Sequence, residues 1–297
     1  MRDLLAKGGP VLPTGGGRMS ELDYDCFGLT DRGLKRDRNE DQFVVADLTK
    51  AIAIQHSSIK LSERRWLTQQ TQARLLLVAD GMGGMGQGDR ASRMVVNTFL
   101  RYAVTTLDWL DPQRPLAEGE LIEDLLDAVA SCKRRLERHA DKQPGSSMGT
   151  TLTCAYLVDG SLYVVHVGDS RCYLLRGGEL RQVTTDHTVA EQLRQEGALT
   201  DSQAKISRWS HVLWQALDSK ERGESEFAPQ AKRIPLEPGD QVLLCSDGLT
   251  KHVPDEDLVR LLSESESAEA CCRAMRDAAL ADGGTDNVTV VVARVSE

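Results

Sequence analysis

The sequence predicts an α+β fold in which hairpin-linked strands cluster together and helices come in pairs. Two hairpins are indicated by turn sequences between apolar runs, Asp159-Gly160 and Arg176-Gly177-Gly178-Glu179, because glycine-containing turns of this kind match the twist of paired strands. Predicted helices at 89–105 and 118–139 follow one another directly, as do those at 255–262 and 268–281. A regular alternation of strand, helix and strand is absent, which argues against a doubly wound parallel sheet.

The first half of the chain supplies three strands and the first helix pair. We expect strands at 24–30, 42–46 and 74–79, the last because residues 75–79 form a continuous apolar run that is typical of a buried strand. The helices at 89–105 and 118–139 each carry an apolar stripe with a helical period. Segment 51–72 is polar and irregular, so we expect an excursion there, and an inert insertion is favoured over a partner-docking loop.

The second half supplies the remaining strands and the shorter helices. Apolar runs predict strands at 150–158, 161–167, 171–175, 180–183, 241–245 and 287–294. Segment 187–196 is predicted to be helical and precedes the pair at 255–262 and 268–281.

Composition excludes several classes of protein. Of the 297 residues, 40% are hydrophobic and 27% are charged, which is ordinary for a globular protein and excludes a collagen-like fibre, a coiled coil or disorder throughout. The apolar run at 75–79 is far too short to cross a membrane. The net charge of −9 argues against a partner such as bare nucleic acid or an anionic membrane. An acidic chain that acts on phosphate needs another source of positive charge, and metal ions are one.

Cysteine usage and the first residues indicate the compartment. The seven cysteines contain no CxxC pair, so a structural zinc site is not indicated, and we expect reduced thiols in a cytoplasmic protein. Residues 1–20 are rich in Gly and Pro and lack a long apolar stretch, which predicts a flexible leader rather than a secretory signal. Composition does not shift afterwards, so we expect residues 21–297 to form one domain.

Acidic residues recur where predicted strands begin or end, four of them within three residues of a glycine. Such positions let a side chain leave the core and let another group approach the backbone closely. The acids are Glu40, Asp41, Asp80, Asp169, Asp247 and Asp286.

A cluster of these acids would need cations. Like charges about 4 Å apart cost about 4 kcal/mol per pair at a surface-type dielectric, and hard divalent cations with oxygen ligands remove that repulsion. Any one of the aspartates is as compatible with an ordinary Asp-Gly turn as with a ligand role. Five aspartates in equivalent positions favour a metal site.

Six short motifs occur in a fixed order along the chain. They are RDRNED at 36–41, VADGMGG at 78–84, MGTTL at 148–152, VGDSR at 167–171, CSDGLT at 245–250 and TDNVT at 285–289. Together they closely resemble the bacterial branch of the metal-dependent (PP2C/PPM-type) serine/threonine protein phosphatases. One motif alone is a weak signal, but six in order between residues 24 and 295 are specific.

The resemblance implies a fold and an activity. The fold would be a PP2C-like α-β-β-α sandwich, with two central, mostly antiparallel sheets flanked by helix pairs, a single phosphatase domain at 21–297 and a flap at about 187–225. The activity would be hydrolysis of phosphoserine and phosphothreonine in proteins by a water activated between two Mn²⁺ or Mg²⁺ ions. The sequence does not specify whether a third metal site is occupied. By analogy the enzyme would be a monomer that opposes a serine/threonine kinase.

The resemblance also implies roles for individual residues. Asp80 would bridge both ions with the Gly81 carbonyl beside it, and Asp247 and Asp286 would hold the first ion. Asp41, together with Glu40, would serve the second ion, mostly through waters. Asp169 would share a third, weaker ion with Asp247. Arg36 would grip the phosphate, because its planar guanidinium can bind two oxygens; a surface ion pair with a neighbouring aspartate is the alternative.

Two places depart from the family pattern or leave alternatives open. Met82 stands where the animal-type branch has a histidine that is a candidate general acid, and a thioether cannot donate a proton; a metal-bound water is our expected donor. In the flap, Trp209 and Trp214 are expected to pack, although Trp209 beside Arg208 could instead contact substrate. His187 is expected to cap or pack rather than to catalyse.

Other functions fit the sequence less well. Residues 81–86 match the dinucleotide-binding pattern G-x-G-x-x-G, but Asp80 would repel a pyrophosphate and no second parallel strand follows. Cys26 and Cys132 each precede an arginine with the spacing of cysteine-based phosphatases, but neither lies in a glycine-rich loop. A catalytically inactive PP2C-fold binding module is the alternative of a different class, and the complete set of acids argues against it. A metal-dependent nuclease shares the chemistry but not the motif order.

Overall fold

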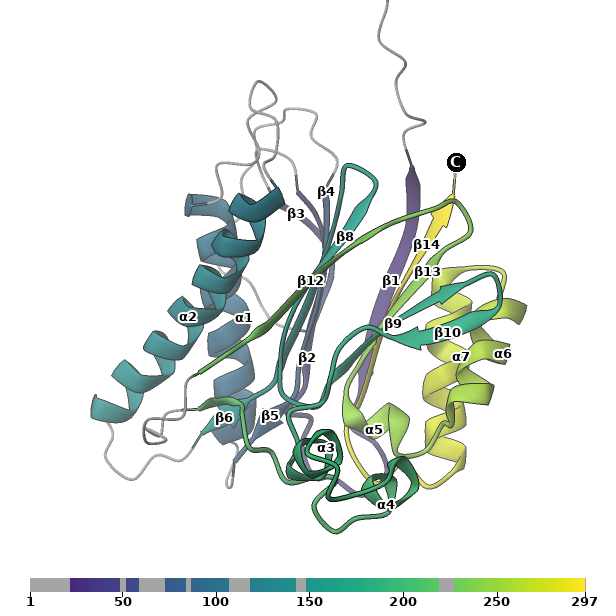
Figure 1. Ribbon diagram of the computed structural model, residues 1–297. Coiled ribbons are helices and arrows are strands. Elements are labelled where there is room, and N and C mark those ends of the chain that lie inside the picture. Colours follow the sequence, from purple (N-terminus) through teal and green to yellow (C-terminus); the bar gives the residue numbers. More distant parts are fainter. Residues whose placement is uncertain are drawn as a thin grey trace, which may run out of the picture.

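The structure is a computed structural model that describes residues 22–48, 52–58, 73–83, 87–106, 118–142, 148–218 and 227–296. Two sheets face each other at its centre, one helix pair covers the outer face of each sheet, and the layers therefore run helix, sheet, sheet, helix (Figure 1). Every pair of neighbouring strands in the described residues is antiparallel. This confirms the predicted α+β sandwich, and it excludes the βαβ unit that dinucleotide binding would require.

The first sheet has six strands and is covered by α1 (Gln87–Thr106) and α2 (Glu118–Lys142). Its order is β12-β8-β7-β4-β2-β3. Those strands are β12 (Gln230–Pro235), β8 (Ser161–Val167), β7 (Leu152–Val158), β4 (Ala73–Ala79), β2 (Gln42–Leu48) and β3 (Ile52–Ser57).

The second sheet has five strands and is covered by α6 (Asp255–Glu264) and α7 (Ala268–Ala281). Its order is β1-β14-β13-β9-β10. Those strands are β1 (Asp23–Asp31), β14 (Val288–Ser296), β13 (Gln241–Cys245), β9 (Arg171–Arg176) and β10 (Glu179–Gln182).

The alternation of side chains along each strand divides the core into three layers. On β4, Leu75 and Leu77 face α1 and α2, whereas Leu76 and Val78 face the other sheet. Val291 completes the layer between the sheets, and the alternate residues of β14 face α6 and α7. Because a strand buried on both faces needs apolar residues at every position, the continuous apolar runs in the sequence are explained by this double burial.

Both predicted hairpins are confirmed. At the turn between β7 and β8, Asp159 has φ +48° and Gly160 has φ +66°, the pair of left-handed residues that the preferred two-residue hairpin turn requires. At the turn between β9 and β10, Gly177 and Gly178 both have positive φ. The turn sequences therefore predict the left-handed backbone conformation of both hairpin turns correctly.

One prediction about the fold is wrong in part, and several short elements were not predicted. Segment 51–72 is not irregular throughout, because β3 adds to the edge of the first sheet by pairing with β2. Residues 59–72 lie outside the described residues, as does the predicted leader at 1–20. The helix predicted at 187–196 is α3 (Val189–Gln195). The strand predicted at 150–158 is divided into β6 (Gly149–Thr150) and β7, and β6 forms a three-stranded sheet with β11 (Leu217–Asp218) and β5 (Gly81–Met82). The elements that no pattern predicted are β12, β11, β5 and the short helices α4 (Asp201–Lys205) and α5 (Asp247–Thr250).

Two further observations bear on the compartment and the chemistry. All seven cysteines are free of disulfides, and six of them are buried. Burial raises the pKa of the Cys26 thiol to about 11 and raises that of Cys132 further, so neither is an activated nucleophile. Within the described residues, no helix combines the length and the apolar character that crossing a membrane would need.

Candidate active site

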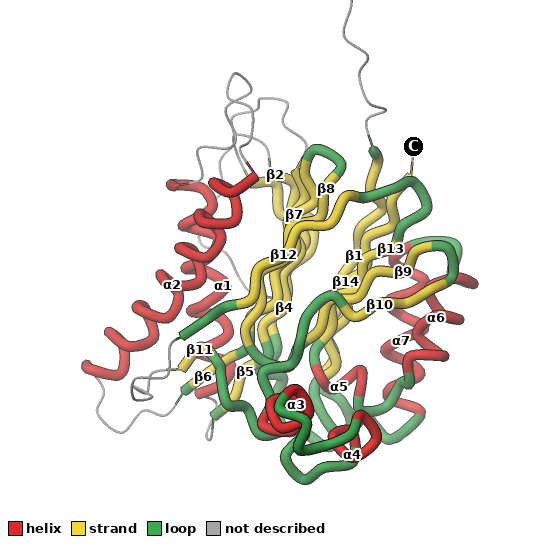
Figure 2. Tube along the Cα trace, viewed as in Figure 1, coloured by secondary structure: helices red, strands yellow, loops and turns green. Residues whose placement is uncertain are grey.

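An open pocket of about 1010 Å³ lies at the end of the two sheets beside α5. Loops, the short helices α3, α4 and α5, and the short strands β5, β6 and β11 form this end of the molecule (Figure 2). The pocket is lined by five of the six predicted acids (Glu40, Asp80, Asp169, Asp247 and Asp286) together with Lys35, Arg36, Asp37, Arg38, Gly81, Met82, Gly83, Thr151, His211, Val212, Leu213, Lys251 and Asn287.

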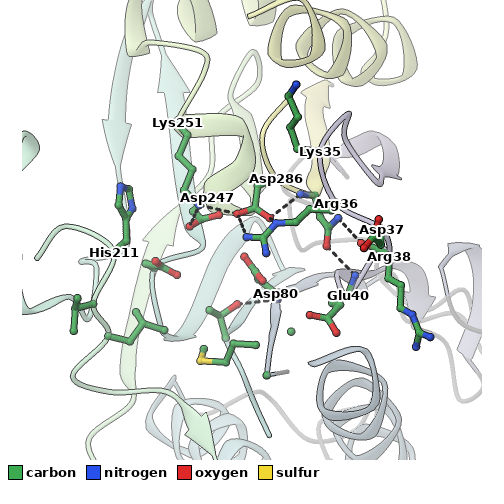
Figure 3. A pocket seen from close by; sticks show the side chains of 18 residues that line it. Lys35, Arg36, Asp37, Arg38, Glu40, Asp80, His211, Asp247, Lys251 and Asp286 are labelled. Carbon is green, nitrogen blue, oxygen red and sulfur yellow. Dashed lines mark hydrogen bonds and ion pairs between the residues drawn. The ribbon is translucent and has the colours of Figure 1, made fainter. Parts of the chain in front are cut away.

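Asp80 directly follows β4. Its backbone forms hydrogen bonds with Thr150, the last residue of β6, and with the next residue, Thr151. Its N–H donates to Thr151 Oγ1 at 2.9 Å, and its carbonyl accepts from the Thr150 hydroxyl at 2.8 Å. These bonds aim the Asp80 carboxylate into the pocket (Figure 3). Burial, together with repulsion from Asp41 and Asp247, raises the pKa of Asp80 well above its usual range.

Gly81, next to Asp80, allows three chain segments to meet. A Cβ atom at Gly81 would lie 2.3 Å from the Gly88 carbonyl oxygen at the start of α1, and 2.6 Å from the Glu40 carbonyl oxygen. Only glycine fits such a contact between backbones. The close approach places Glu40 beside the Asp80 loop.

Asp247 and Asp286 are paired with two cationic side chains. Asp247 is the first residue of α5, and Lys251, one turn later, lies with Nζ 2.6 Å from Asp247 Oδ2 and 2.9 Å from Asp286 Oδ2. Arg36 binds Asp286 through Nε at 2.7 Å and Nη2 at 2.8 Å. Figure 3 shows Arg36 and Lys251 approaching the two carboxylates from opposite sides. Burial tends to raise the pKa of Asp286, but its hydrogen bonds with Arg36 and Lys251 outweigh this and lower it.

Asn287 ties the loop after β1 to the last strand. Its side-chain NH₂ donates to the carbonyls of Arg32 at 2.8 Å and Arg38 at 2.9 Å, and its side-chain oxygen accepts from the Glu40 N–H at 2.8 Å. These bonds shape the loop that carries Arg36. The role of Asn287 was not predicted, although its place directly after Asp286 in the last motif was a usable signal.

Asp41 lies beneath the pocket rather than on its wall. It is 1% exposed, its Oδ2 accepts from the Thr289 hydroxyl at 2.6 Å, and its Oδ1 has no hydrogen-bond partner within the described residues. Burial raises the pKa of Asp41 to about 6 even though the hydroxyls of Thr289 and Ser246 oppose the shift. Glu40, its neighbour, lines the pocket instead.

Asp169 is positioned by a contact between Gly168 and the flap. The His187 N–H donates to the Gly168 carbonyl at 2.7 Å, and the Gly168 N–H donates to His187 Nδ1 at 3.1 Å. Burial lowers the pKa of His187 to about 4, so this histidine is neutral and packs, as expected. Burial, with repulsion from Asp247, raises the pKa of Asp169 to about 8.

The two flap tryptophans differ in their surroundings. The Trp214 ring lies against His187, with ring centroids 5.3 Å apart. Trp209 is 39% exposed, and the Arg208 guanidinium lies 4.6 Å from its ring centroid. Trp214 therefore packs as predicted, whereas Trp209 is presented to solvent.

Comparisons with known proteins identify the family. The protein phosphatase 2C family model matches residues 63–282. The chain belongs to the protein phosphatase 2C family. It is 39% identical over 224 residues to the serine/threonine protein phosphatase PstP of Mycobacterium tuberculosis, which covers 75% of this chain but only 40% of that relative. It is 30% identical to the serine/threonine phosphatase stp of Listeria monocytogenes, covering 73% of this chain and 83% of that one.

Solved structures of the family share the fold. The catalytic domain of PstP in complex with two manganese ions has a TM-score of 0.69 and 33% identity, and the alignment covers 93% of this chain and all of that one. The phosphatase Stp1 of Staphylococcus aureus has a TM-score of 0.72 and 26% identity, covering 95% of this chain and all of that one. These likenesses extend over nearly the whole chain, so the family assignment applies to the sandwich and to the pocket at its end.

The acids of this PP2C pocket have the chemistry of a divalent-cation site. All the donors are oxygens, which Mn²⁺ and Mg²⁺ prefer. Burial, together with repulsion from neighbouring carboxylates, raises the pKa of Asp80 and Asp169. Oδ1 of Asp247, like Oδ1 of Asp41, is buried without a hydrogen-bond partner in the described residues. As these residues stand, no group of three or more acidic, His or Cys side chains in the described part of the chain surrounds one point as a metal site would. Lys251 and Arg36 hold two of the acids at their positions instead.

Proposed function

We propose that this chain is a protein serine/threonine phosphatase that requires Mn²⁺ or Mg²⁺ and hydrolyses phosphoserine and phosphothreonine in proteins. The observation that carries the proposal is the convergence of Asp80, Asp247 and Asp286 with Arg36 in one open pocket. Relatives named as serine/threonine phosphatases, one of them solved with two manganese ions, support it. The chain spans 40% of the length of the PstP relatives, so the activity, substrates and partners of a longer protein are part of the proposal.

In this proposal, the acids divide between two ions. Asp80, Asp247 and Asp286 would hold the first, and Asp80, the Gly81 carbonyl and Glu40 would hold the second, with Asp41 supporting it from beneath. When bound, such ions supply Lewis acidity that lowers the pKa of a water and neutralises charge on a phosphoryl group.

The residues of the chain provide the phosphate grip and the orientation. Arg36 is 56% exposed at its side chain, so its guanidinium can turn from Asp286 to two oxygens of a substrate phosphate at small desolvation cost. Asn287 fixes the loop that carries Arg36 through three hydrogen bonds. Met82 lines the same pocket and has no proton to give to a departing serine or threonine oxygen.

The biological setting is proposed on general grounds. Seven cysteines without disulfides fit a reducing compartment, which supports a cytoplasmic location. A phosphatase of phosphoserine and phosphothreonine must act on products of a serine/threonine kinase, so a kinase of that class is the proposed opposing partner. We propose a monomer, because residues of a single chain already bring Asp80, Asp247, Asp286 and Arg36 together in one pocket.

Hydrolysis of a phosphothreonine peptide tests the proposal. The purified chain is assayed with Mn²⁺, with Mg²⁺ and with excess EDTA, alongside Asp247→Asn and the matched control Asp37→Asn, which removes an exposed acid from the same rim. We expect turnover that needs the metal, is lost in Asp247→Asn and is kept within about threefold in Asp37→Asn, a change of less than 1 kcal/mol. Absence of turnover with either metal, from protein shown to be folded, would favour the inactive binding module.

A further inference from the structure

Lys251 has a position in the pocket that the proposed mechanism does not use. It is the residue that directly follows the short helix α5 (Asp247–Thr250), where it forms the C-cap. Its ammonium nitrogen lies within hydrogen-bond distance of Asp247 Oδ2 at 2.6 Å and of Asp286 Oδ2 at 2.9 Å. A single cation therefore joins the two carboxylates that would hold the first divalent ion.

Lys251 is held there strongly. Its side chain is only 24% exposed, and although burial disfavours the charged form, Asp247 and Asp286 outweigh burial and raise its pKa above the usual range. The α5 geometry fixes the spacing, because the Lys251 N–H donates to the Asp247 carbonyl at 2.9 Å. The backbone thus places the Lys251 ammonium next to Asp247.

Arg36 does not duplicate this role. Its guanidinium binds Asp286 alone through two nitrogens, and its side chain is more than half exposed. In Figure 3, Lys35 extends away from Asp247 and Asp286, although it lines the same pocket. Among the described basic residues that line the pocket, only Lys251 lies within hydrogen-bond distance of both carboxylates.

We propose that Lys251 is a resident cation that competes with divalent ions for Asp247 and Asp286, and so sets the metal concentration at which the site fills. The inference rests on the proposed function, since it assigns these two acids to the first ion. A divalent ion and an ammonium cannot both occupy the space between two carboxylates whose oxygens already lie 2.6 and 2.9 Å from Nζ, because they would repel each other as well as overlap. For an ion to bind both carboxylates through these Oδ2 atoms, the lysine must first give up at least one of them.

The competition has a second consequence in the metal-free protein. There, the Lys251 ammonium offsets part of the repulsion between Asp247 and Asp286, because it lies 2.6 Å from an oxygen of one and 2.9 Å from an oxygen of the other. Without the ammonium, the metal-free fold loses that compensation, whereas the metal-loaded fold does not need it.

A Mn²⁺ titration of the metal-free protein tests the proposal without using activity. Binding is measured by calorimetry at constant ionic strength for the wild type, for Lys251→Met, which keeps the aliphatic length, and for the matched control Lys35→Met. We expect Lys251→Met to bind Mn²⁺ at least tenfold more tightly than the wild type, and Lys35→Met to stay within twofold. Equal or weaker binding by Lys251→Met would overturn the proposal.

Thermal unfolding supplies an independent readout. In EDTA, Lys251→Met should melt below the wild type, and in saturating Mn²⁺ the two should converge; a difference that persists unchanged in Mn²⁺ would contradict competition. If Lys251→Met does not fold, Lys251→Gln, which removes the charge but keeps a polar side chain at this position, takes its place with the same expected direction. Absence of Mn²⁺ binding in every variant would instead overturn the proposed function, whereas equal binding in all of them overturns the competition alone.

Discussion

The aspartates on the two sides of the pocket differ in their neighbours and in the direction of their pKa shifts. On the cation-paired side, Asp247 and Asp286 contact Lys251 and Arg36, and the pKa of Asp286 is lowered. On the carboxylate-rich side, which consists of Asp41, Asp80 and Asp169, burial and repulsion from neighbouring aspartates raise the pKa of every member. Of these five aspartates, only the two on the cation-paired side form ion pairs with cationic side chains among the described residues. External cations therefore have the most repulsion to offset on the carboxylate-rich side. Its member Asp80 is also repelled by Asp247 and Asp286 of the cation-paired side.

Replacing Asp80 should have the largest effect, because it breaks the carboxylate-rich side at its centre. We expect Asp80→Asn to lower kcat on a phosphothreonine peptide by about 1,000-fold or more, since several kcal/mol of transition-state stabilisation would be lost. Metal-free Asp80→Asn should melt no lower than the metal-free wild type, because the change removes a repelled charge. Full activity in this variant would contradict the site assignment.

Replacing Arg36 tests the cation-paired side. Arg36→Ala should lower kcat/KM by about 10- to 100-fold, the value of a charge-assisted hydrogen-bond pair to phosphate of about 1.5–3 kcal/mol. Inhibition by inorganic phosphate should weaken in parallel, because the same guanidinium would bind it. Unchanged phosphate inhibition would show that Arg36 serves only as a partner of Asp286.

The pH dependence of stability distinguishes the two sides in the metal-free protein. Asp169 has a pKa of about 8 in the fold against about 3.9 when unfolded, so the folded state binds the extra proton between those values. Its contribution to stability is present below pH 4 and is lost as the pH rises through 8, and Asp41, with a pKa of about 6, acts in the same direction. We expect a lower melting temperature at pH 8.5 than at pH 5.5 in EDTA, and a smaller or reversed difference in saturating Mn²⁺.

Thiol alkylation should have the smallest effect. Six of the seven cysteines are buried, and no cysteine is among the described residues that line the pocket. Treatment of the folded protein with iodoacetamide should change kcat by less than about twofold, which is below 0.5 kcal/mol. Loss of activity that tracks modification of a single thiol would revive the cysteine mechanism.

Much of the sandwich was predictable because its strands are buried on both faces. The continuous apolar runs of β4 and β14 and the two glycine-containing turns need no long-range information to be recognised. β12 was missed because its residues are partly or fully exposed along its whole length, so it has no apolar period. β3 was not predicted because it lies in a mostly polar segment of the sequence. It is recognised as a strand by its pairing with β2 in the structure.

The site was predictable at the level of motifs but not of contacts. The acids were identified because they stand at strand ends next to glycines, whereas the contact of Lys251 with Asp286 joins residues 35 positions apart. Asn287 bonds to carbonyls about 250 residues earlier in the chain, and no local pattern encodes that. The burial of Asp41 beneath Glu40 likewise depends on Thr289 of the last strand.

The central claim is that these acids hold the divalent ions on which the reaction depends. Counting the Mn²⁺ ions bound per chain, by native mass spectrometry of the wild type and of Asp80→Asn, tests it most directly. The account predicts two ions in the wild type and at most one in Asp80→Asn, because Asp80 would contact both. A wild-type chain that binds no Mn²⁺, or an Asp80→Asn chain that keeps both ions, would contradict it.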